Sequence, residues 1–128
     1  MHKIFNGDGG IAAPFSNYAH AVEASKAARR LYISGQLGVR PDGVTQPDFD
    51  SQCRTAFDNI KVLLAEAGMG LEDLVKLTIY LTRRDDIVRF RQIRDEVMGD
   101  IRTASTLLLV AGLANPAWLV EIEAVAAT

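Results

Sequence analysis

The spacing of apolar residues changes twice between residues 50 and 98, and this change limits the possible folds more than any other feature of the sequence. From Asp50 to Ala67 the apolar residues recur every three or four positions, which predicts a helix ended by Gly68. From Leu74 to Thr82 apolar and polar residues alternate, which predicts a half-buried strand. From Asp86 to Met98 the helical spacing returns. The chain therefore combines helices and strands in alternation.

Shorter extended segments flank this central region on both sides. Before it we expect strands at Lys3–Phe5, Tyr18–Ala24 and Leu31–Gln36. After it, the segment Ser105–Ala111 is rich in Leu and Val, which favours a strand buried on both faces, and Trp118–Ala126 is the last strand. The predicted order is three strands, helix, strand, helix and two strands.

A helix followed by a strand occurs twice, which predicts crossovers that place both helices on one face of a mostly continuous sheet. A chain of 128 residues forms one domain, spanning residues 1–128, and has no third layer for the opposite face. We therefore expect that the open face of the sheet packs against copies of the same chain.

Composition excludes several classes of protein. Fourteen Lys and Arg against sixteen Asp and Glu give a net charge of −2, and no block of like charge is present that could neutralise a run of phosphates. No nucleic-acid partner is therefore expected. The apolar run Leu107–Ala114 is far shorter than a membrane span, and the first ten residues do not resemble a signal peptide. With the single cysteine, these features predict a cytoplasmic protein without a membrane partner.

No general catalytic or metal-binding motif is present in the sequence. His2 and His20 stand far apart, and a lone histidine is more often a surface or structural residue than a metal ligand. Cys53 falls on the apolar stripe of the first predicted helix, which favours a small buried side chain over a reactive thiol. We therefore predict no metal site.

Two carboxylates in the last predicted strand are the most unusual polar residues. Glu121 and Glu123 are two positions apart, so both project from the same face of a strand. On a central strand this indicates a solvated face, an ion pair or a pocket, and the first two are the more frequent. The sequence Ser34–Gln36, at the end of an apolar strand, offers a hydroxyl, an approachable backbone and an amide, although a glycine there is usually only a turn.

Seven segments, in this order, match the pattern of a known family: Tyr18–Val22, Leu31–Gln36, Asn59–Ile60, Ala67–Gly68, Leu74–Thr82, Ala104–Thr106 and Leu119–Ala126. Together they resemble the Rid family of reactive-intermediate deaminases, also called RidA/YjgF and once labelled L-PSP endoribonucleases. The resemblance covers most of the chain.

The resemblance implies an α+β, chorismate-mutase-like fold, with two helices packed on one face of a mixed β-sheet. It also implies a homotrimer with a central β-barrel and ligand clefts between subunits. Family deaminases hydrolyse enamine and imine intermediates to 2-oxo acids and ammonia without metal or organic cofactors. A small-molecule substrate is therefore expected.

By the same resemblance, Glu121 positions and deprotonates the attacking water. The substrate-binding residues carried over from the family pattern are Tyr18 of the N-terminal segment, Ser34, Gly35 and Gln36 of the cleft wall, and Thr106 of the facing strand.

This sequence departs from the family pattern at one position. Deaminating members carry an arginine, which binds the substrate carboxylate, where this chain has Ala104. Its loss costs several kcal/mol of binding unless another residue replaces it. Arg102, two residues earlier, and Arg91, on the second predicted helix, are candidate replacements, although each is more often a solvent-exposed residue.

Three functions remain open at this point. The first is a hydrolase acting on an enamine or imine, and the second is a non-catalytic trimer whose cleft binds a small metabolite. The third is the nucleolytic or chaperone-like role sometimes attached to this family, against which the charge balance argues. We favour the hydrolase.

Overall fold

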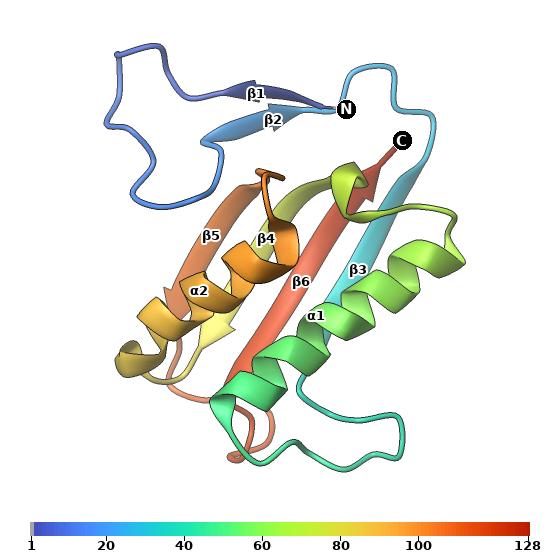
Figure 1. Ribbon diagram of the computed structural model, residues 1–128, viewed down its shortest axis with the longest axis vertical. Coiled ribbons are helices and arrows are strands. Elements are labelled where there is room, and N and C mark those ends of the chain that lie inside the picture. The colour runs from blue at the N-terminus through green and yellow to red at the C-terminus, as the bar shows by residue number, and fades with distance from the viewer. Residues whose placement is uncertain (1) are drawn as a thin grey trace.

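Two helices lie side by side across one face of a four-stranded sheet in the computed structural model, which describes residues 2–128 (Figure 1). The strand order is β3 (Arg30–Leu37), β6 (Val120–Ala127), β4 (Leu74–Leu81) and β5 (Ala104–Leu109). Strand β6 is antiparallel to both of its neighbours, whereas β4 and β5 are parallel, so the sheet is mixed. The last strand is therefore central, as predicted.

Helix α1 (Phe49–Glu66) begins and ends at residues suited to those positions. It begins after Asp48, whose carboxylate accepts a hydrogen bond of 2.8 Å from the Ser51 backbone N–H. It ends just before Gly68, where φ is +73°, a value that favours glycine. Helix α2 (Ile87–Met98) lies between β4 and β5 in the sequence. The short 3₁₀ helices η1 (Leu71–Asp73) and η2 (Arg84–Asp86) flank β4.

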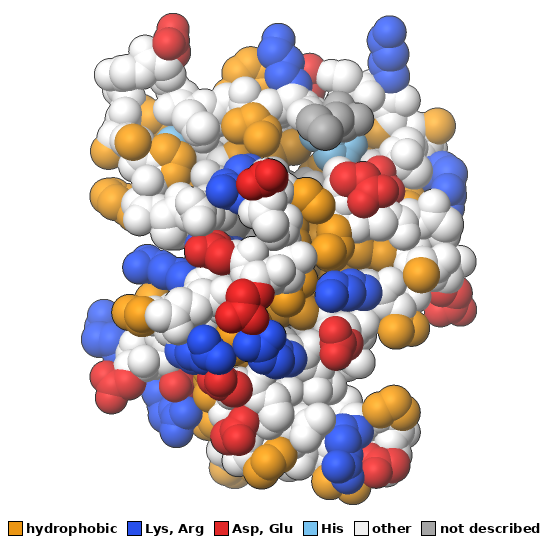
Figure 2. Space-filling view, viewed as in Figure 1, with side chains coloured by type: hydrophobic (Ala, Val, Ile, Leu, Met, Phe, Trp, Pro, Cys, Tyr) orange, Lys and Arg blue, Asp and Glu red, His pale blue; other side chains and the backbone are white. Residues whose placement is uncertain are grey.

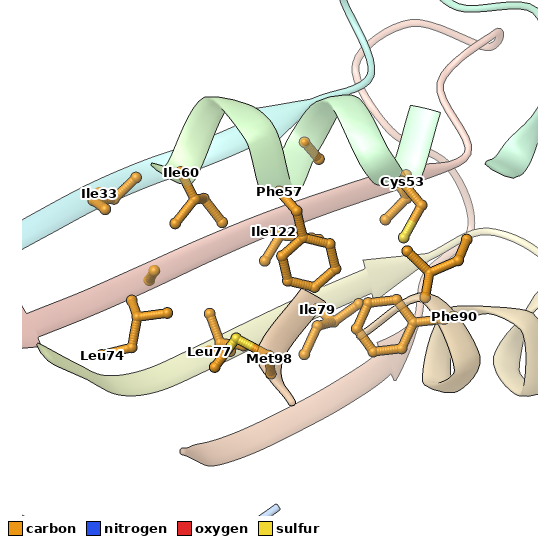
Figure 3. Close-up of a cluster of buried hydrophobic side chains, with 14 of the residues drawn as sticks. Ile33, Cys53, Phe57, Ile60, Leu74, Leu77, Ile79, Phe90, Met98 and Ile122 are labelled. Atoms are coloured by element: carbon orange, nitrogen blue, oxygen red, sulfur yellow. The ribbon is translucent and has the colours of Figure 1, made fainter. Parts of the chain in front are cut away.

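The core lies between the helices and the sheet (Figure 3). Alternate side chains of β4 and β6 are buried there, in agreement with the alternation of the sequence. The rings of Phe57 from α1 and Phe90 from α2 stack with their centroids 6.1 Å apart. The fully buried side chains of the core include Ile60, Leu77, Ile79, Leu81, Ile93 and Ile122. This burial holds each helix to the sheet through one apolar stripe.

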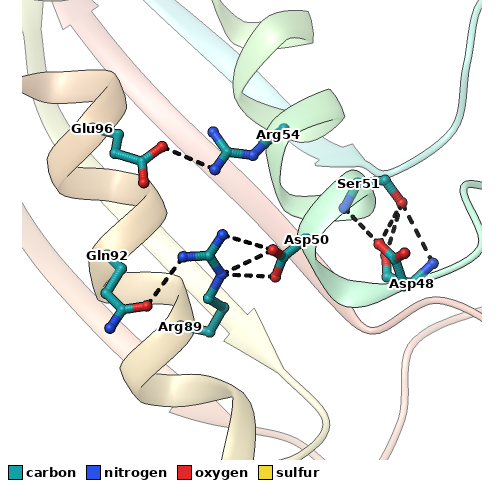
Figure 4. A network of polar contacts seen from close by, with 7 residues as sticks. All are labelled: Asp48, Asp50, Ser51, Arg54, Arg89, Gln92 and Glu96. Atoms are coloured by element: carbon teal, nitrogen blue, oxygen red, sulfur yellow. Dashed lines mark hydrogen bonds and ion pairs between the residues drawn. The ribbon is translucent and has the colours of Figure 1, made fainter.

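Ion pairs join the exposed sides of the two helices (Figure 4). Arg89 of α2 donates to both carboxylate oxygens of Asp50, at 2.7 to 2.9 Å, and Arg54 of α1 lies 2.9 Å from Glu96. The hydrogen bond from Arg89 lowers the pKa of Asp50 below its ordinary value. Charged side chains of both signs gather over α2 in Figure 2. These exposed pairs connect the two helices but contribute little to stability, because water screens them.

The N-terminal strands form a separate small sheet. Strands β1 (Lys3–Phe5) and β2 (Ala21–Glu23) pair with each other in antiparallel register. The segment before β2 contacts the main sheet, because the Ala19 backbone N–H donates to the Thr103 carbonyl at 2.8 Å and Ala19 bridges to Ala104. This contact brings the N-terminal segment beside the start of β5.

The predicted α+β class, with two helices on one face of a mixed sheet, and the predicted order of elements are confirmed, and two details are wrong. The segment predicted as a strand at 18–24 forms only the short β2, which pairs with β1. The sheet is therefore less continuous than expected. Strand β5 was expected to be buried on both faces but is an edge strand, and Thr106, Leu108 and Leu109 are exposed. Of its three leucines only Leu107 packs against the core, and it is half-buried.

None of the helices within residues 2–128 is long and apolar enough to cross a membrane.

Cys53 provides a test of the core. Its side chain is fully buried in α1, as the sequence predicted, and burial raises the pKa of its thiol to about 12. At pH 8 only about one thiol in ten thousand is then ionised. We expect one thiol per chain to react with a disulfide reagent such as DTNB only after unfolding in guanidinium chloride. Rapid reaction of the native protein at pH 8 would contradict the packing of α1.

Candidate functional site

The face of the sheet opposite the helices carries most of the polar side chains of β4 and β6. Register and burial place the following residues on this open face: Tyr32 of β3, Lys76, Thr78 and Tyr80 of β4, Thr106 and Leu108 of β5, and Glu121, Glu123 and Val125 of β6. No segment within residues 2–128 forms a layer over them, and Tyr32 is 73% exposed. A candidate site on this face is therefore accessible to a ligand or to another chain.

Glu121 lies directly over the backbone of Gly35 on the neighbouring strand. Strand β3 has one extra residue between Ile33 and Gln36 relative to β6, which is a β-bulge. A Cβ atom added at Gly35 would overlap the Glu121 carboxylate. Glycine at this position is therefore required for Glu121 to keep its present conformation.

The two carboxylates of β6 have different surroundings. Glu123 accepts a hydrogen bond from the Tyr80 hydroxyl, and this bond raises the pKa of Tyr80 above its ordinary value. Glu121 forms no side-chain hydrogen bond or ion pair with any residue in the range 2–128. Glu123 therefore accepts a hydrogen bond from a neutral hydroxyl rather than forming the ion pair considered from the sequence, whereas Glu121 is free to bind a ligand or water.

A pocket of about 410 Å³ contains both carboxylates. The carboxylate pocket, as we name it, is lined by Gly35, Tyr80, Val110, Gly112, Leu113, Ala114, Glu121 and Glu123. Its outer wall is the loop between β5 and β6. Buried Gln52 of α1 holds the end of this loop, because it donates to the Ala117 carbonyl at 3.0 Å and accepts from the Leu119 N–H at 2.8 Å.

Ser34 and Gln36 point to a different place from Gly35. Both line a groove of about 390 Å³ between β3 and α1, together with Leu63 and Ala67 of the helical region. The Gln36 side-chain amide donates to the Ser34 carbonyl at 3.0 Å. The bulge thus divides the sequence Ser34–Gln36 between two sides of the edge strand.

Tyr18 and Arg91 come together in a third pocket, of about 160 Å³, beside the edge strand β5. The arginine pocket, as we name it, is lined by Phe15, Ser16, Tyr18, Phe90, Arg91, Arg94, Ser105 and Leu107. The contact of Ala19 with β5 positions its N-terminal wall. Ser105 pairs in register with buried Leu77, so this pocket lies on the helix side of the sheet.

Two further predicted residues lie elsewhere. Arg102 precedes β5 and donates to the carbonyls of Gly99 and Ile101 at 2.7 and 3.2 Å, and it lines a pocket with His2 and Leu74. Thr106 lies on the open face of β5, where its hydroxyl accepts a hydrogen bond of 2.8 Å from Lys76.

Sequence reasoning missed Arg94, which lines the same pocket as Arg91 and has a buried side chain. One signal could have identified it, because Arg94 follows Phe90 by four positions and therefore shares its helix face. Ser105 was missed as well, because only its neighbour Thr106 was carried over from the family pattern to this strand. Lys76 was recognised only as part of the polar face of a strand.

No group of three or more His, Cys, Asp or Glu side chains is placed to hold a metal ion in the described part of the chain. The rings of His2 and His20 form hydrogen bonds with the carbonyls of Asp73 and Ala12, at 3.2 and 2.7 Å. The donor set of the two main pockets is thus made of carboxylates, hydroxyls and guanidinium groups. Such a set suits an organic substrate that exchanges protons and carries negative charge.

Comparison with known proteins identifies relatives that span most of the chain. The family described as endoribonuclease L-PSP matches residues 10–128. A RutC family protein of Pyrococcus horikoshii is 32% identical over 115 residues, which are 88% of this chain and 88% of that protein. The putative reactive intermediate deaminase TdcF of Escherichia coli is 32% identical over 101 residues, which cover 75% of this chain and 77% of TdcF.

Solved structures show the same fold. The Rid family protein YyfB of Yersinia pestis, described as of unknown function, superposes with a TM-score of 0.84, at 26% identity over 99% of this chain and 98% of its own. RidA from an Antarctic Psychrobacter has a TM-score of 0.75, at 30% identity over 91% and 92% of the two chains. The chain therefore belongs to the Rid/YjgF family, as its seven matching segments predicted.

Proposed function

We propose that the protein hydrolyses a reactive enamine or imine metabolite to a carbonyl compound and ammonia, with Glu121 positioning the attacking water. The observation that carries this proposal is the free carboxylate of Glu121 in the carboxylate pocket, beside a second carboxylate that is already paired. The name of TdcF, a putative reactive intermediate deaminase, supports the same reaction class.

The chemistry requires one base and one water molecule. An enamine first takes a proton on carbon and becomes an iminium ion. Water then adds to the iminium carbon while the Glu121 carboxylate accepts a proton from it, which gives a carbinolamine. Glu121 returns this proton to the nitrogen, which leaves as ammonia while the hydroxyl group loses its proton and the carbon–oxygen double bond forms. Atoms balance with water as the only co-reactant, so the proposed reaction uses no cofactor.

The complete site in this proposal spans two chains. The carboxylate pocket lies on the open face of the sheet, whereas the arginine pocket lies on the helix side beside β5, so one chain does not bring them together. In a homotrimer built around a central barrel of sheets, the open face of one chain meets the edge of the next. Tyr18 and Arg91 of one chain then complete the pocket that contains Glu121 and Gly35 of another. Thr106 lies on the same open face as this pocket, whereas Ser34 and Gln36, which line the separate groove between β3 and α1, take no part in the proposed site.

The alternative function is that of a non-catalytic trimer that binds a small metabolite. One observation favours it, namely that Ala104 occupies the start of β5, where deaminating members carry the carboxylate-binding arginine. Ammonia release distinguishes the two functions. The alternative holds if the protein releases no ammonia from 2-aminoacrylate or 2-iminobutanoate, whereas an Ala104→Arg variant does.

Replacing Glu121 by Gln tests the role of the base. We expect turnover to fall by about two to four orders of magnitude, because the amide cannot accept the proton of the water. The measurement is ammonia release above the buffer rate while a dehydratase generates the imine in situ. Glu123→Gln is the matched control and loses less than tenfold, since Tyr80 can still donate to the amide oxygen. Equal activity of Glu121→Gln and the unchanged protein would remove Glu121 from the mechanism.

Replacing Gly35 by Ala tests the position of the same carboxylate. The new methyl group would displace the flexible end of Glu121 without disturbing the core, so we expect nearly unchanged thermal stability and at least tenfold lower turnover. A crystal structure of the variant should show the displaced carboxylate. Gly112→Ala, which also adds a methyl group to the lining of the pocket but meets no atom within 4 Å, should retain activity. Full activity of Gly35→Ala would show that the position of Glu121 is unimportant.

The two-chain site also predicts the oligomeric state. Multi-angle light scattering should give a mass near three times the 14.0 kDa of one chain. Mixing Glu121→Gln with an inactive variant of Tyr18 or Arg91 should restore part of the activity after subunit exchange, because some clefts then combine two intact halves. A mass near that of one chain would exclude a site shared between chains.

A further inference from the structure

We propose that Arg94 binds the carboxylate of the substrate, in place of the arginine that position 104 does not carry. This inference rests on the proposed function, and it assigns a binding residue to the arginine pocket.

The guanidinium of Arg94 is held in place with part of its hydrogen-bonding capacity unused. Its side chain is only 7% exposed, and the guanidinium carbon lies 5.9 Å from the centre of the Phe90 ring. The Nε and Nη2 atoms both donate to one oxygen of Asp95, at 3.2 and 3.1 Å. Nη1 has no hydrogen-bond partner within residues 2–128, and Arg94 lines the pocket. A second carboxylate can therefore be bound without breaking an existing contact.

The charge of the pocket favours an anion. Asp95 is shared, because its other oxygen accepts a hydrogen bond of 3.1 Å from Asn17. Arg91 takes part in no ion pair among the described residues, so the pocket contains one partly neutralised and one free cation. The Arg94 guanidinium is also shielded from water, which strengthens its interaction with a carboxylate.

The neutral lining determines the size and shape of the ligand. The Tyr18 hydroxyl accepts a bond from the Phe15 N–H at 3.3 Å and keeps its own proton to donate, and Ser105 supplies a second hydroxyl. Phe15 and Leu107 provide an apolar surface for a short side chain. A volume of about 160 Å³ is too small for a nucleotide. It suits a 2-imino or 2-oxo acid of a few carbon atoms.

Direct binding tests this assignment without turnover. The probe is 2-oxobutanoate, an oxo acid of the expected product class, and 2-oxobutanamide is its neutral match. Calorimetric titration of the unchanged protein should show at least tenfold tighter binding of the acid than of the amide. In Arg94→Gln we expect at least tenfold weaker binding of the acid and unchanged binding of the amide. Arg91→Gln should weaken binding of the acid by a smaller factor.

Controls separate a binding role from a structural one. Arg84→Gln removes an exposed cation on η2, outside the pocket, and should bind the acid like the unchanged protein. Since Arg94 is buried, Arg94→Lys is the second variant, because it keeps the charge and the packed stem. It should keep the unfolding temperature, bind the acid with intermediate affinity and raise KM more than it lowers kcat.

Three outcomes would overturn the inference: equal binding of acid and amide, full binding of the acid by Arg94→Gln, or loss of binding in Arg102→Gln with Arg94→Gln unaffected. Failure of the proposed function has a different signature. If the unchanged protein binds the acid through Arg94 but releases no ammonia from imines, the binding site stands and the deaminase assignment is wrong. If the unchanged protein releases ammonia and KM is the same in Arg94→Lys and Arg94→Gln, the deaminase assignment stands and the binding role of Arg94 is wrong.

Discussion

The alternation of β4 and β6 is the constraint on which the rest of the structure depends. It directs one set of apolar side chains toward α1 and α2, where Phe57 and Phe90 close the core. The same alternation leaves Glu121 and Glu123 on the opposite face, because neighbouring residues of a strand point to opposite sides. Two helices can cover only one face. The chain therefore presents its most polar strand face at a surface that it does not cover itself.

Within that face, the Tyr80 hydroxyl gives the carboxylates of Glu121 and Glu123 different hydrogen bonding. Tyr80 is directly opposite Glu121 in the β4–β6 register but donates to Glu123, which lies diagonally across. One carboxylate is thereby fixed as a hydrogen-bond acceptor, and the other is left unpaired. A proposed base needs this freedom, because it must accept a proton from water in the reaction. Strand β4, which carries Tyr80, thus determines which of the two glutamates is left unpaired and available as the proposed base.

Much of the fold could be predicted from local patterns, and most of what was missed depends on contacts between distant segments. The two helices, β4 and the central position of β6 follow from apolar spacing and from the order of elements. The edge position of β5 does not, because Leu107, Leu108 and Leu109 have the same composition whether one face or two are covered. The position of a strand in a sheet is decided by pairing between segments far apart in the chain.

The candidate site was predicted in part. Four of the predicted residues line pockets, namely Glu121, Gly35, Tyr18 and Arg91. The sequence could not show that Glu121 and Gly35 lie on one side of the sheet and Tyr18 and Arg91 on the other. Arg94 was the main omission. Burying a charged residue on the apolar face of an amphipathic helix costs free energy, so such a residue often has a role that offsets the cost. The apolar spacing of the second helix places Arg94 on that face, and this position could have identified it.

The close approach of Glu121 to Gly35 links two positions that are far apart in the sequence. Strand β3 contributes no reacting group at Gly35, yet it sets how far the carboxylate of β6 extends over the sheet. A side chain gained at position 35 could be accommodated by shortening Glu121 to Asp, which withdraws the carboxylate by one methylene group. Natural variation at the two positions should therefore be correlated, and divergence of the reaction within this fold can begin at a glycine.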